Sequence, residues 1–238
     1  MRMPSGPARA AETFRRFERK MLIDPAKRMF VAAWLRHTCR PARDFPEGRI
    51  TSCYFDTRGL DEYHATLDGD FDKQKVRLRW YDDISEKDTT MAFIEVKKKS
   101  GFETRKNREL INVSSGSLRR GAFDSILPPQ RLRPFLRRLD YSGDAQLLPV
   151  SVISYQRLRF RAPGTEVGVS LDFNITASLP RGGAKVPLGT AIIEIKGADM
   201  ELLPSLRKLG RFGSTWSAHS KYGLALELLL TRGGPWPR

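Results

Sequence analysis

Short segments in which charged and apolar residues alternate recur along this 238-residue sequence. Charged residues stand at every second position of KVRLRWY, FIEVKKK, YQRLRFR and IIEIKG, with apolar residues between them. Because side chains along a β-strand point alternately to its two faces, each segment predicts a strand with one charged and one apolar face. Most of these charges are positive, a pattern that suits a polyphosphate and its metal ion. A sheet with its charged face in water is the alternative interpretation.

Local sequence patterns also predict the helices and strands in the rest of the chain. Asp24 followed by Pro25 predicts the start of a helix that runs to about His37, with Met29, Phe30, Ala33 and Trp34 as its apolar stripe. A proline-interrupted connector is expected at 117–148, and C-terminal helices at about 200–209, ended by Gly210, and from about Lys221 to Leu230. Strands are predicted from Arg15 to Leu22 and at about 49–55, 74–82, 91–99, 104–112, 150–161, 166–174 and 190–196.

About eight strands predict an α+β protein built on an eight-stranded antiparallel β-barrel with a basic interior. With the charged faces inward, helices must cover the outside, and the Phe30/Trp34 stripe and the Leu-rich C-terminal helix are the available covers. A weak echo, KVRLR before EVK and RLRFR before EIK, suggests a sheet built twice from similar hairpins. Residues 1–13 are expected to form a mobile arm, and residues 14–238 a single domain.

The charge of the chain limits its partners. Lys and Arg total 42 against 27 acidic residues, a formal net charge of +15, which predicts a polyanionic partner: nucleic acid, an anionic membrane surface or a phosphate-rich small molecule. Cys39 and Cys53 match no metal-binding spacing and are expected to be buried thiols. With neither a signal peptide nor a bilayer-length apolar run in the sequence, a cytoplasmic location is expected.

Taken in order, the segments FERKMLI, SCYFDTRGLDEY, KVRLRWY, FIEVKKK, YQRLRF, VSLDFNI, IIEIKG and HSKYGLAL resemble the VTC-type polyphosphate polymerase domain, a branch of the CYTH-like triphosphate tunnel metalloenzymes. The resemblance runs from about Phe17 to Leu226. It implies a tunnel that binds a triphosphate chain through Arg and Lys side chains, with Mn²⁺ or Mg²⁺ held by Glu. The implied activity is the extension of polyphosphate from ATP.

Carried over position by position, the resemblance implies two sets of site residues. Glu194 matches the metal ligand, Glu18 and Glu95 are further candidates, and Asp172 is a second ligand to consider. The residues expected to hold the reacting phosphates are Lys20, Arg77, Arg79, Lys97, Arg157 and Lys221, and additional phosphate contacts are expected from Lys106, Arg159 and Lys196. Guanidinium groups that grip phosphate oxygens, and a divalent ion between carboxylate and phosphate, are the chemistry that these residue types provide.

Two positions depart from the family pattern: Arg16 stands where an acidic residue begins the first strand, and Gly168 stands where an Arg is usual. One phosphate contact is therefore missing, or Arg159 or Arg161 replaces it.

A triphosphatase and a non-catalytic polyphosphate binder stay open as alternatives, and Glu95 and Glu194 can also be read as ion-pair partners. No specific nucleic acid is expected, export would need a separate membrane partner, and the oligomeric state is open.

The scattered histidines, His37, His64 and His219, are read as surface or capping residues, and Tyr54, Trp80 and Tyr81 as packing aromatics.

Overall fold

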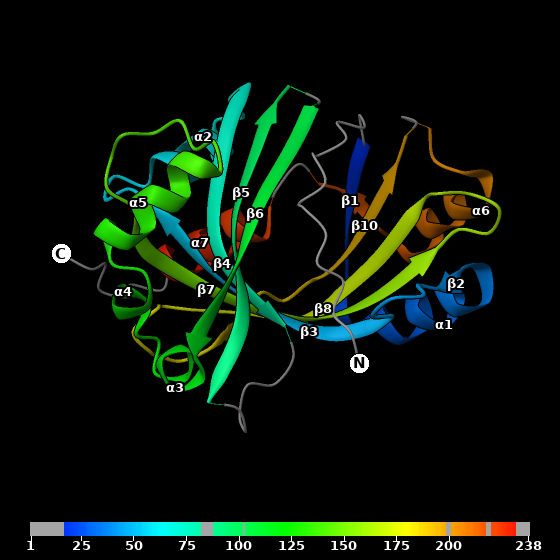
Figure 1. Cartoon of the computed structure of the whole chain (residues 1–238). Helices are drawn as coiled ribbons and strands as arrows, with labels where there is room; N and C mark the ends of the chain where they lie inside the picture. Colours follow the sequence, from blue (N-terminus) through cyan, green and yellow to red (C-terminus); the bar gives the residue numbers. More distant parts are fainter. Residues whose placement is uncertain (1–16, 82–87, 102, 199–200, 218–219, 232–238) are drawn as a thin grey trace, which may run out of the picture.

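A single, strongly curled antiparallel sheet forms the centre of the molecule (Figure 1). The computed structural model describes residues 17–81, 88–101, 103–198, 201–217 and 220–231, so the predicted mobile arm lies outside the described residues. The strands are β1 (Phe17–Ile23), β2 (Arg40–Pro41), β3 (Glu47–Asp56), β4 (Asp72–Tyr81), β5 (Thr89–Ser100), β6 (Glu103–Ser114), β7 (Leu148–Arg161), β8 (Gly168–Ser178), β9 (Val186–Pro187), β10 (Ala191–Gly197) and β11 (Thr215–Trp216).

Helical segments lie between and after these strands. They are η1 (Pro25–Lys27), α1 (Arg28–Thr38), α2 (Asp61–Leu67), α3 (Ser115–Arg119), α4 (Phe123–Ile126), α5 (Pro129–Arg138), α6 (Pro204–Arg207), η2 (Lys208–Phe212) and α7 (Lys221–Thr231). Among the described residues, no helix combines the length and the apolar character needed to cross a membrane. The α+β class is therefore confirmed, and the predicted strands match β1, β3–β8 and β10 within a few residues.

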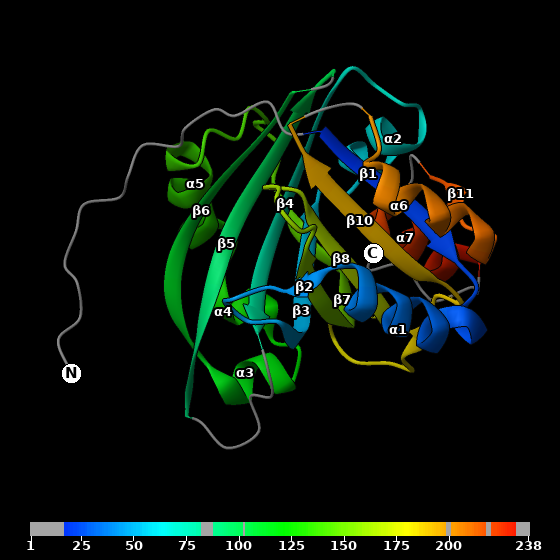
Figure 2. The ribbon, with the colours of Figure 1, turned by 90° about the vertical axis from the view of Figure 1, so that its right-hand side faces the viewer.

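The prediction of a closed eight-stranded barrel is wrong. Over the residues that the structure describes, the sheet has eleven strands, and the order along it is β11-β1-β10-β8-β7-β3-β4-β5-β6, with β2 on β7 and β9 on β8. Its two ends face each other across the molecule (Figures 1 and 2), but in the described part of the chain no ladder joins them. Instead the side chain of Lys97 on β5 donates a hydrogen bond of 2.8 Å to Glu18 on β1. If backbone hydrogen bonds joined the two ends of the sheet, the inward-pointing lysines of both ends would lie as close together as residues on neighbouring strands, and their like charges would repel.

The outer faces of the two sheet halves are apolar and covered by helices, as the charge pattern predicted. On one half, Val76 and Leu78 of β4 pack with Phe123, Leu132 and Leu136 of α4 and α5. On the other half, Met21, Leu171 and Ile193 pack with Val31 and Leu35 of α1 and Leu206 of α6. The charged face is therefore the inner, concave one. The weak sequence echo does not reflect equivalent hairpins, because β4 and β5 are neighbours whereas β8 separates β7 from β10.

The predicted buried stripe of α1 is wrong in part. The helix buries Val31, Ala32 and Leu35, whereas Met29 and Phe30 are 62% and 70% exposed. Asp24 does cap the start, since its Oδ1 accepts a hydrogen bond from the amide of Ala26 at 2.9 Å, and the 3-10 turn η1 lies between this cap and the helix. Because apolar residues occur on most sides of this helix, their spacing alone could not select the buried face.

The C-terminal helix α7 does not cover the outside of the sheet, contrary to the prediction. Tyr222 and Leu226 pack with Tyr54, Tyr155 and Ile192, which lie on the concave face, so α7 fills one end of the curl. The preceding helix expected at 200–209 is two short pieces, α6 and η2, and it ends at Gly213, with φ of 68°, rather than at Gly210.

Helix α2 was not predicted, and it depends on a tertiary cap. Asp56, buried at the end of β3, accepts hydrogen bonds from the backbone amides of Thr57, Glu62 and Tyr63, and the hydroxyl of Tyr222 also donates to it. This carboxylate therefore joins β3, α2 and α7, and it holds α7 in place at the concave face.

Candidate functional site

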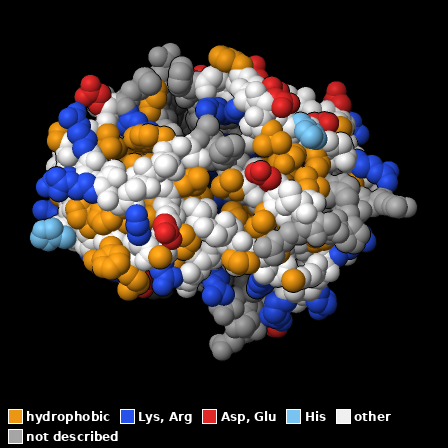
Figure 3. Space-filling view, turned by 180° about the vertical axis from the view of Figure 1, so that it is seen from behind, with side chains coloured by type: hydrophobic (Ala, Val, Ile, Leu, Met, Phe, Trp, Pro, Cys, Tyr) orange, Lys and Arg blue, Asp and Glu red, His pale blue; other side chains and the backbone are white. Residues whose placement is uncertain are grey.

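Strand register brings the predicted phosphate-binding residues onto one face. Arg77 lies opposite Glu95, which lies opposite Arg108, and Lys20 lies opposite Glu194 on the other half of the sheet. The strands thereby carry eight of the predicted cationic residues on the concave face: Lys20, Arg77, Arg79, Lys97, Lys106, Arg157, Arg159 and Lys196. The ninth, Lys221, reaches this face from helix α7. On the face seen from behind, by contrast, Lys and Arg are scattered among hydrophobic and acidic side chains (Figure 3).

The first cluster on this face joins two carboxylates to two cations. Arg157 donates to Asp172 through Nε at 2.5 Å and to Glu194 through Nη2 at 2.8 Å. Lys221, at the start of α7, lies 2.5 Å from Asp172 Oδ2 and 2.9 Å from Glu194 Oε1. Burial alone would raise the pKa of Glu194, but Lys221 and Arg157 hold it well below its usual range. Both cations are therefore fixed in position before any ligand binds.

The second cluster surrounds Glu95, whose side chain is fully buried. Arg77 donates to it at 2.7 Å through Nε, Arg79 lies 3.9 Å away and Lys106 3.5 Å away. Burial alone would raise the pKa of Glu95, but these cations, Arg77 foremost, lower it to about 2. The carboxylate is thus ionised and, from β5, orients the cationic groups of the two neighbouring strands, β4 and β6.

Hydroxyl groups complete the support of the two arginines of β4. Arg77 donates to the hydroxyl of Tyr54 at 3.2 Å, and Arg79 donates to Ser52 at 3.0 Å and to Tyr155 at 3.3 Å. Tyr54 is also a packing aromatic, since its ring stacks on that of Tyr222 with centroids 4.9 Å apart. Alternation identified the arginines, but hydroxyl partners on the neighbouring strands carry no sequence signal of their own.

Lysines of β1, β4, β5 and β6 gather at a third place. Lys75 lies directly opposite Lys97, which lies opposite Lys106, although like charges in cross-strand pairs are destabilising. Among the described residues, Glu18 offsets them at 2.8 Å from Lys97 and 3.7 Å from Lys20, and Glu95 lies 3.5 Å from Lys106. Burial, with the charges of Lys20 and Lys97, lowers the pKa of Lys75 to about 7. The four lysines therefore outnumber the carboxylates beside them, and the arrangement is suited to an anion.

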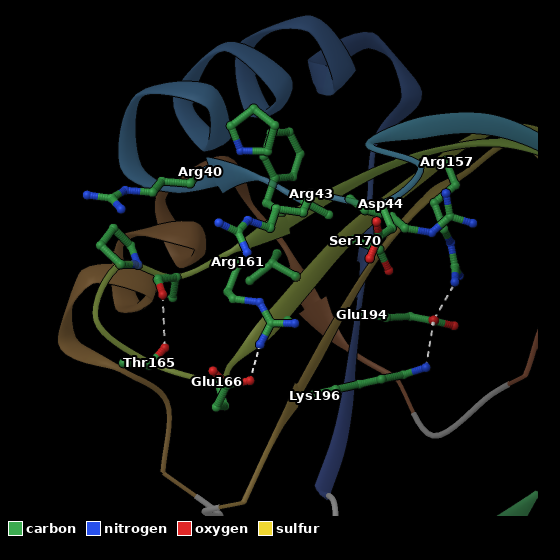
Figure 4. A pocket seen from close by; sticks show the side chains of 18 of the residues that line it. Arg40, Arg43, Asp44, Arg157, Arg161, Thr165, Glu166, Ser170, Glu194 and Lys196 are labelled. Atoms are coloured by element: carbon green, nitrogen blue, oxygen red, sulfur yellow. Dashed lines mark hydrogen bonds and ion pairs between the residues drawn. The ribbon is translucent and has the colours of Figure 1, made fainter. Parts of the chain in front are cut away.

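A cleft opens from the first cluster toward the solvent (Figure 4). Its volume is about 980 Å³, and Arg157, Glu194 and Ser170 form its inner end. Gly168 lies on its wall opposite Arg161 and Lys196, and a side chain at this position would meet open space. Further out, the cleft is lined by Arg40 and Arg43, which the sequence analysis missed because they lie outside any alternating segment.

The fit of the carboxylates to a divalent metal ion depends on how many of them meet and on which of their oxygens are free. Among the described residues, no group of three His, Cys, Asp or Glu side chains has a metal-binding arrangement. Mg²⁺ and similar ions, however, commonly use one or two carboxylates together with substrate phosphates and water. Glu194 and Glu18 lie at diagonal positions of neighbouring strands, and the oxygens of Glu194 retain lone pairs beyond those used by Arg157 and Lys221. These two residues fit such an ion.

The remaining candidates stand apart from that pair. Glu95 Oε1 has no hydrogen-bond partner among the described residues, but Glu95 is enclosed by Arg77, Arg79 and Lys106, which favours the ion-pair interpretation. Asp172 is fully buried against Arg157 and Lys221 and acts as their anchor. His37 and His64 are exposed on α1 and α2, and His219 lies outside the described residues. Cys39 and Cys53 are buried free thiols, as predicted.

Comparison with known proteins gives one match to a family model. The model described as the VTC domain matches residues 15–230. No curated protein sequence matches the chain. Among solved structures, the chain is similar to a "putative adenylate cyclase" from Bacillus halodurans, with 14% identity, 94% of this chain and 92% of that chain covered, and a TM-score of 0.48.

Two further solved structures are similar to the chain at comparable levels. A "putative adenylate cyclase" from Vibrio parahaemolyticus is 12% identical, with coverage of 87% of this chain and 97% of that chain and a TM-score of 0.42. The Schizosaccharomyces pombe Mediator head module is 10% identical, with coverage of 91% and 94% and a TM-score of 0.44.

Proposed function

Because the chain belongs to the VTC domain family, we propose that it is a divalent-metal-dependent phosphoryl transferase that extends polyphosphate from a nucleoside triphosphate. The observation that carries the proposal is the concave face itself. Its arginines and lysines come from several strands and α7, and Glu95, Asp172 and Glu194 hold them in place from beneath. Such a face suits a thin chain of phosphates, each with negative oxygens on all sides.

In phosphoryl transfer, the protein contributes mainly positioning and charge stabilisation. Arg77 and Arg79 of β4 would grip one part of the phosphate chain, and Arg157 and Lys221 would hold the part next to Glu194. Their anchoring by buried carboxylates means that little reorganisation is needed when charge develops on the transferred phosphoryl group. A divalent ion held by Glu194 and Glu18 would supply further neutralisation of that charge.

Product analysis tests the proposal directly. The purified protein is incubated with ATP and Mn²⁺, and the products are separated on a polyacrylamide gel. A ladder of long chains supports the polymerase. Release of phosphate without a ladder supports a triphosphatase on the same site, because water would then replace phosphate as the acceptor. The absence of both products contradicts either enzyme.

A non-catalytic polyanion binder is the second candidate, and the net charge of +15 and the glycine at position 168 favour it. Its binding should weaken steeply with salt, as for any phosphate contact that releases counterions. The enclosed concave face should admit a single phosphate chain but not a duplex. Preference for duplex DNA over tripolyphosphate at equal salt would contradict binding in the concave face.

A further inference from the structure

The cleft beside the first cluster is wider than a phosphate chain requires. It lies between the segment 40–44 and the turn at 161–168, and its volume of about 980 Å³ is in the range of sites that hold organic ligands of drug size. It is continuous with Arg157 and Glu194 (Figure 4), so a ligand in it would touch the site proposed above. A molecule with both a phosphate chain and a larger organic part would use both regions.

The walls of the cleft suit a flat, partly apolar group. Guanidinium planes stack on aromatic rings, and such stacking accepts every nucleobase because each has a π-face. In this cleft, cationic side chains stand beside apolar ones that reach its surface. The cations are Arg40, Arg43, Arg159, Arg161 and Lys196, and the accessible apolar residues are Pro41, Ala42 and Pro163.

Besides Glu194 at its inner end, the cleft is lined by two further carboxylates, Asp44 and Glu166, and one of them distinguishes a nucleoside from a bare phosphate chain. Glu166 is neutralised by Arg161, with which it forms an ion pair. Asp44 is exposed, and within the described part of the chain no ion pair or side-chain hydrogen bond occupies its carboxylate. A carboxylate repels polyphosphate, which offers only acceptors near neutral pH, whereas ribose hydroxyls are donors that it can accept.

The loop that carries Asp44 is held in a strained conformation. Its neighbour Phe45 has a φ of 52°, which is unusual for a bulky residue, and the carbonyl of Phe45 accepts a hydrogen bond of 2.8 Å from Arg159 Nη1. The backbone amide of Ala42 donates to the carbonyl of Arg159 as well. Arg159 therefore fixes Asp44 at the cleft through the loop.

On the premise of the triphosphate site proposed above, we infer that this cleft holds the nucleoside end of a nucleoside triphosphate. Asp44 accepts a hydrogen bond from a ribose hydroxyl, the base stacks on the guanidinium and apolar walls, and the phosphates run inward to Arg157 and Glu194. The cleft therefore recognises nucleoside triphosphates without selecting a base, and ATP and GTP bind with similar affinity.

The test compares Asp44→Ala with wild type for two ligands, ATP and tripolyphosphate, by titration calorimetry in EDTA so that no turnover occurs. Loss of one hydrogen bond should weaken ATP binding about threefold to tenfold. Binding of tripolyphosphate should be unchanged or tighter, since a repulsive charge is removed. The matched control Asp144→Ala, an exposed acid in the loop after α5, should alter neither affinity.

The opposite responses of the two ligands make the outcome decisive. If Asp44→Ala changes ATP and tripolyphosphate binding equally, or changes neither, the nucleoside assignment is wrong while the proposed function stands. If GTP binds wild type far more weakly than ATP, base-tolerant stacking is wrong. If wild type binds no tripolyphosphate, the proposed triphosphate site fails, and this inference fails with it. Circular dichroism of each variant checks that the exposed substitution leaves the fold intact.

Discussion

At the scale of single residues, Glu194 is a buried, ionised carboxylate and also the proposed ligand of the metal ion. Glu194→Gln should abolish Mn²⁺-dependent turnover, because the ion loses a ligand, while tripolyphosphate still binds and even binds more tightly. Asp172 continues to hold Arg157 and Lys221, so the cations stay in place. The thermal midpoint measured beside turnover separates this role from an ion-pair role alone. In that second case, stability falls by up to a few kcal/mol and activity per folded molecule is kept.

Arg77 gives a prediction of a different kind, because its partner is a fully buried carboxylate. Arg77→Ala should weaken tripolyphosphate binding by about tenfold or more, since a charge-assisted contact contributes roughly 1.5–3 kcal/mol. It should also lower the thermal midpoint, because Glu95 loses its closest partner. Arg133→Ala, which removes the same charge from an exposed position of α5, is the control. Equal weakening by both variants would indicate a diffuse electrostatic surface rather than a site.

At the scale of elements, the alternation of charge predicted the long strands and their inner faces, because one buried apolar face suffices to set the phase of a strand. The same pattern says nothing about which strand lies beside which, and so the open ends of the sheet were not foreseen. Helix α2 depends on Asp56 at the end of β3, a tertiary cap that has no local signature. Arg43 and Asp44 lie in a loop without periodicity, and only the fold brings them to Arg157.

The lysine rows of β4, β5 and β6 predict a dependence on pH. The folded state lowers the pKa of Lys75 from 10.5 to about 7, so between these values the unfolded chain binds a proton that the folded chain does not. The contribution of Lys75 to the free energy of unfolding therefore rises with pH from about 7 to 10.5. A bound polyanion favours the charged lysine, so tripolyphosphate binding at pH 8 should take up protons.

Calorimetry in buffers of different ionisation enthalpy measures that proton uptake. Lys75→Met should reduce the proton uptake. In thermal melts this variant should have a higher midpoint than wild type at pH 7, and the difference in midpoint should shrink as the pH rises toward 10. Lys106, whose pKa burial lowers to about 8, accounts for part of the uptake that remains. Identical uptake by wild type and Lys75→Met would contradict the assignment of a neutral Lys75 in the free protein.

At the scale of the whole molecule, the described part of the sheet curls without closing, and side chains rather than a ladder join its two ends. Across the gap between β1 and β5, the side chain of Lys97 donates a hydrogen bond to Glu18, and α7 fills one end of the curl. Lys20 and Lys75 add repulsion between the two halves. The gap between β1 and β5 is therefore expected to open in the free protein more readily than the paired strands of the sheet.

A phosphate chain bound on the concave face would contact cations of both halves and draw them together. Tripolyphosphate should therefore slow amide hydrogen exchange in β1 and β6, the strands near the two ends of the sheet, more than in the central pair β3 and β7. The effect should decline as salt screens the phosphate contacts. Lys97→Ala should reduce the protection of β1, because it removes the lysine that reaches across to Glu18. Protection confined to α7 and the central strands would mean that the anion binds without bridging the gap.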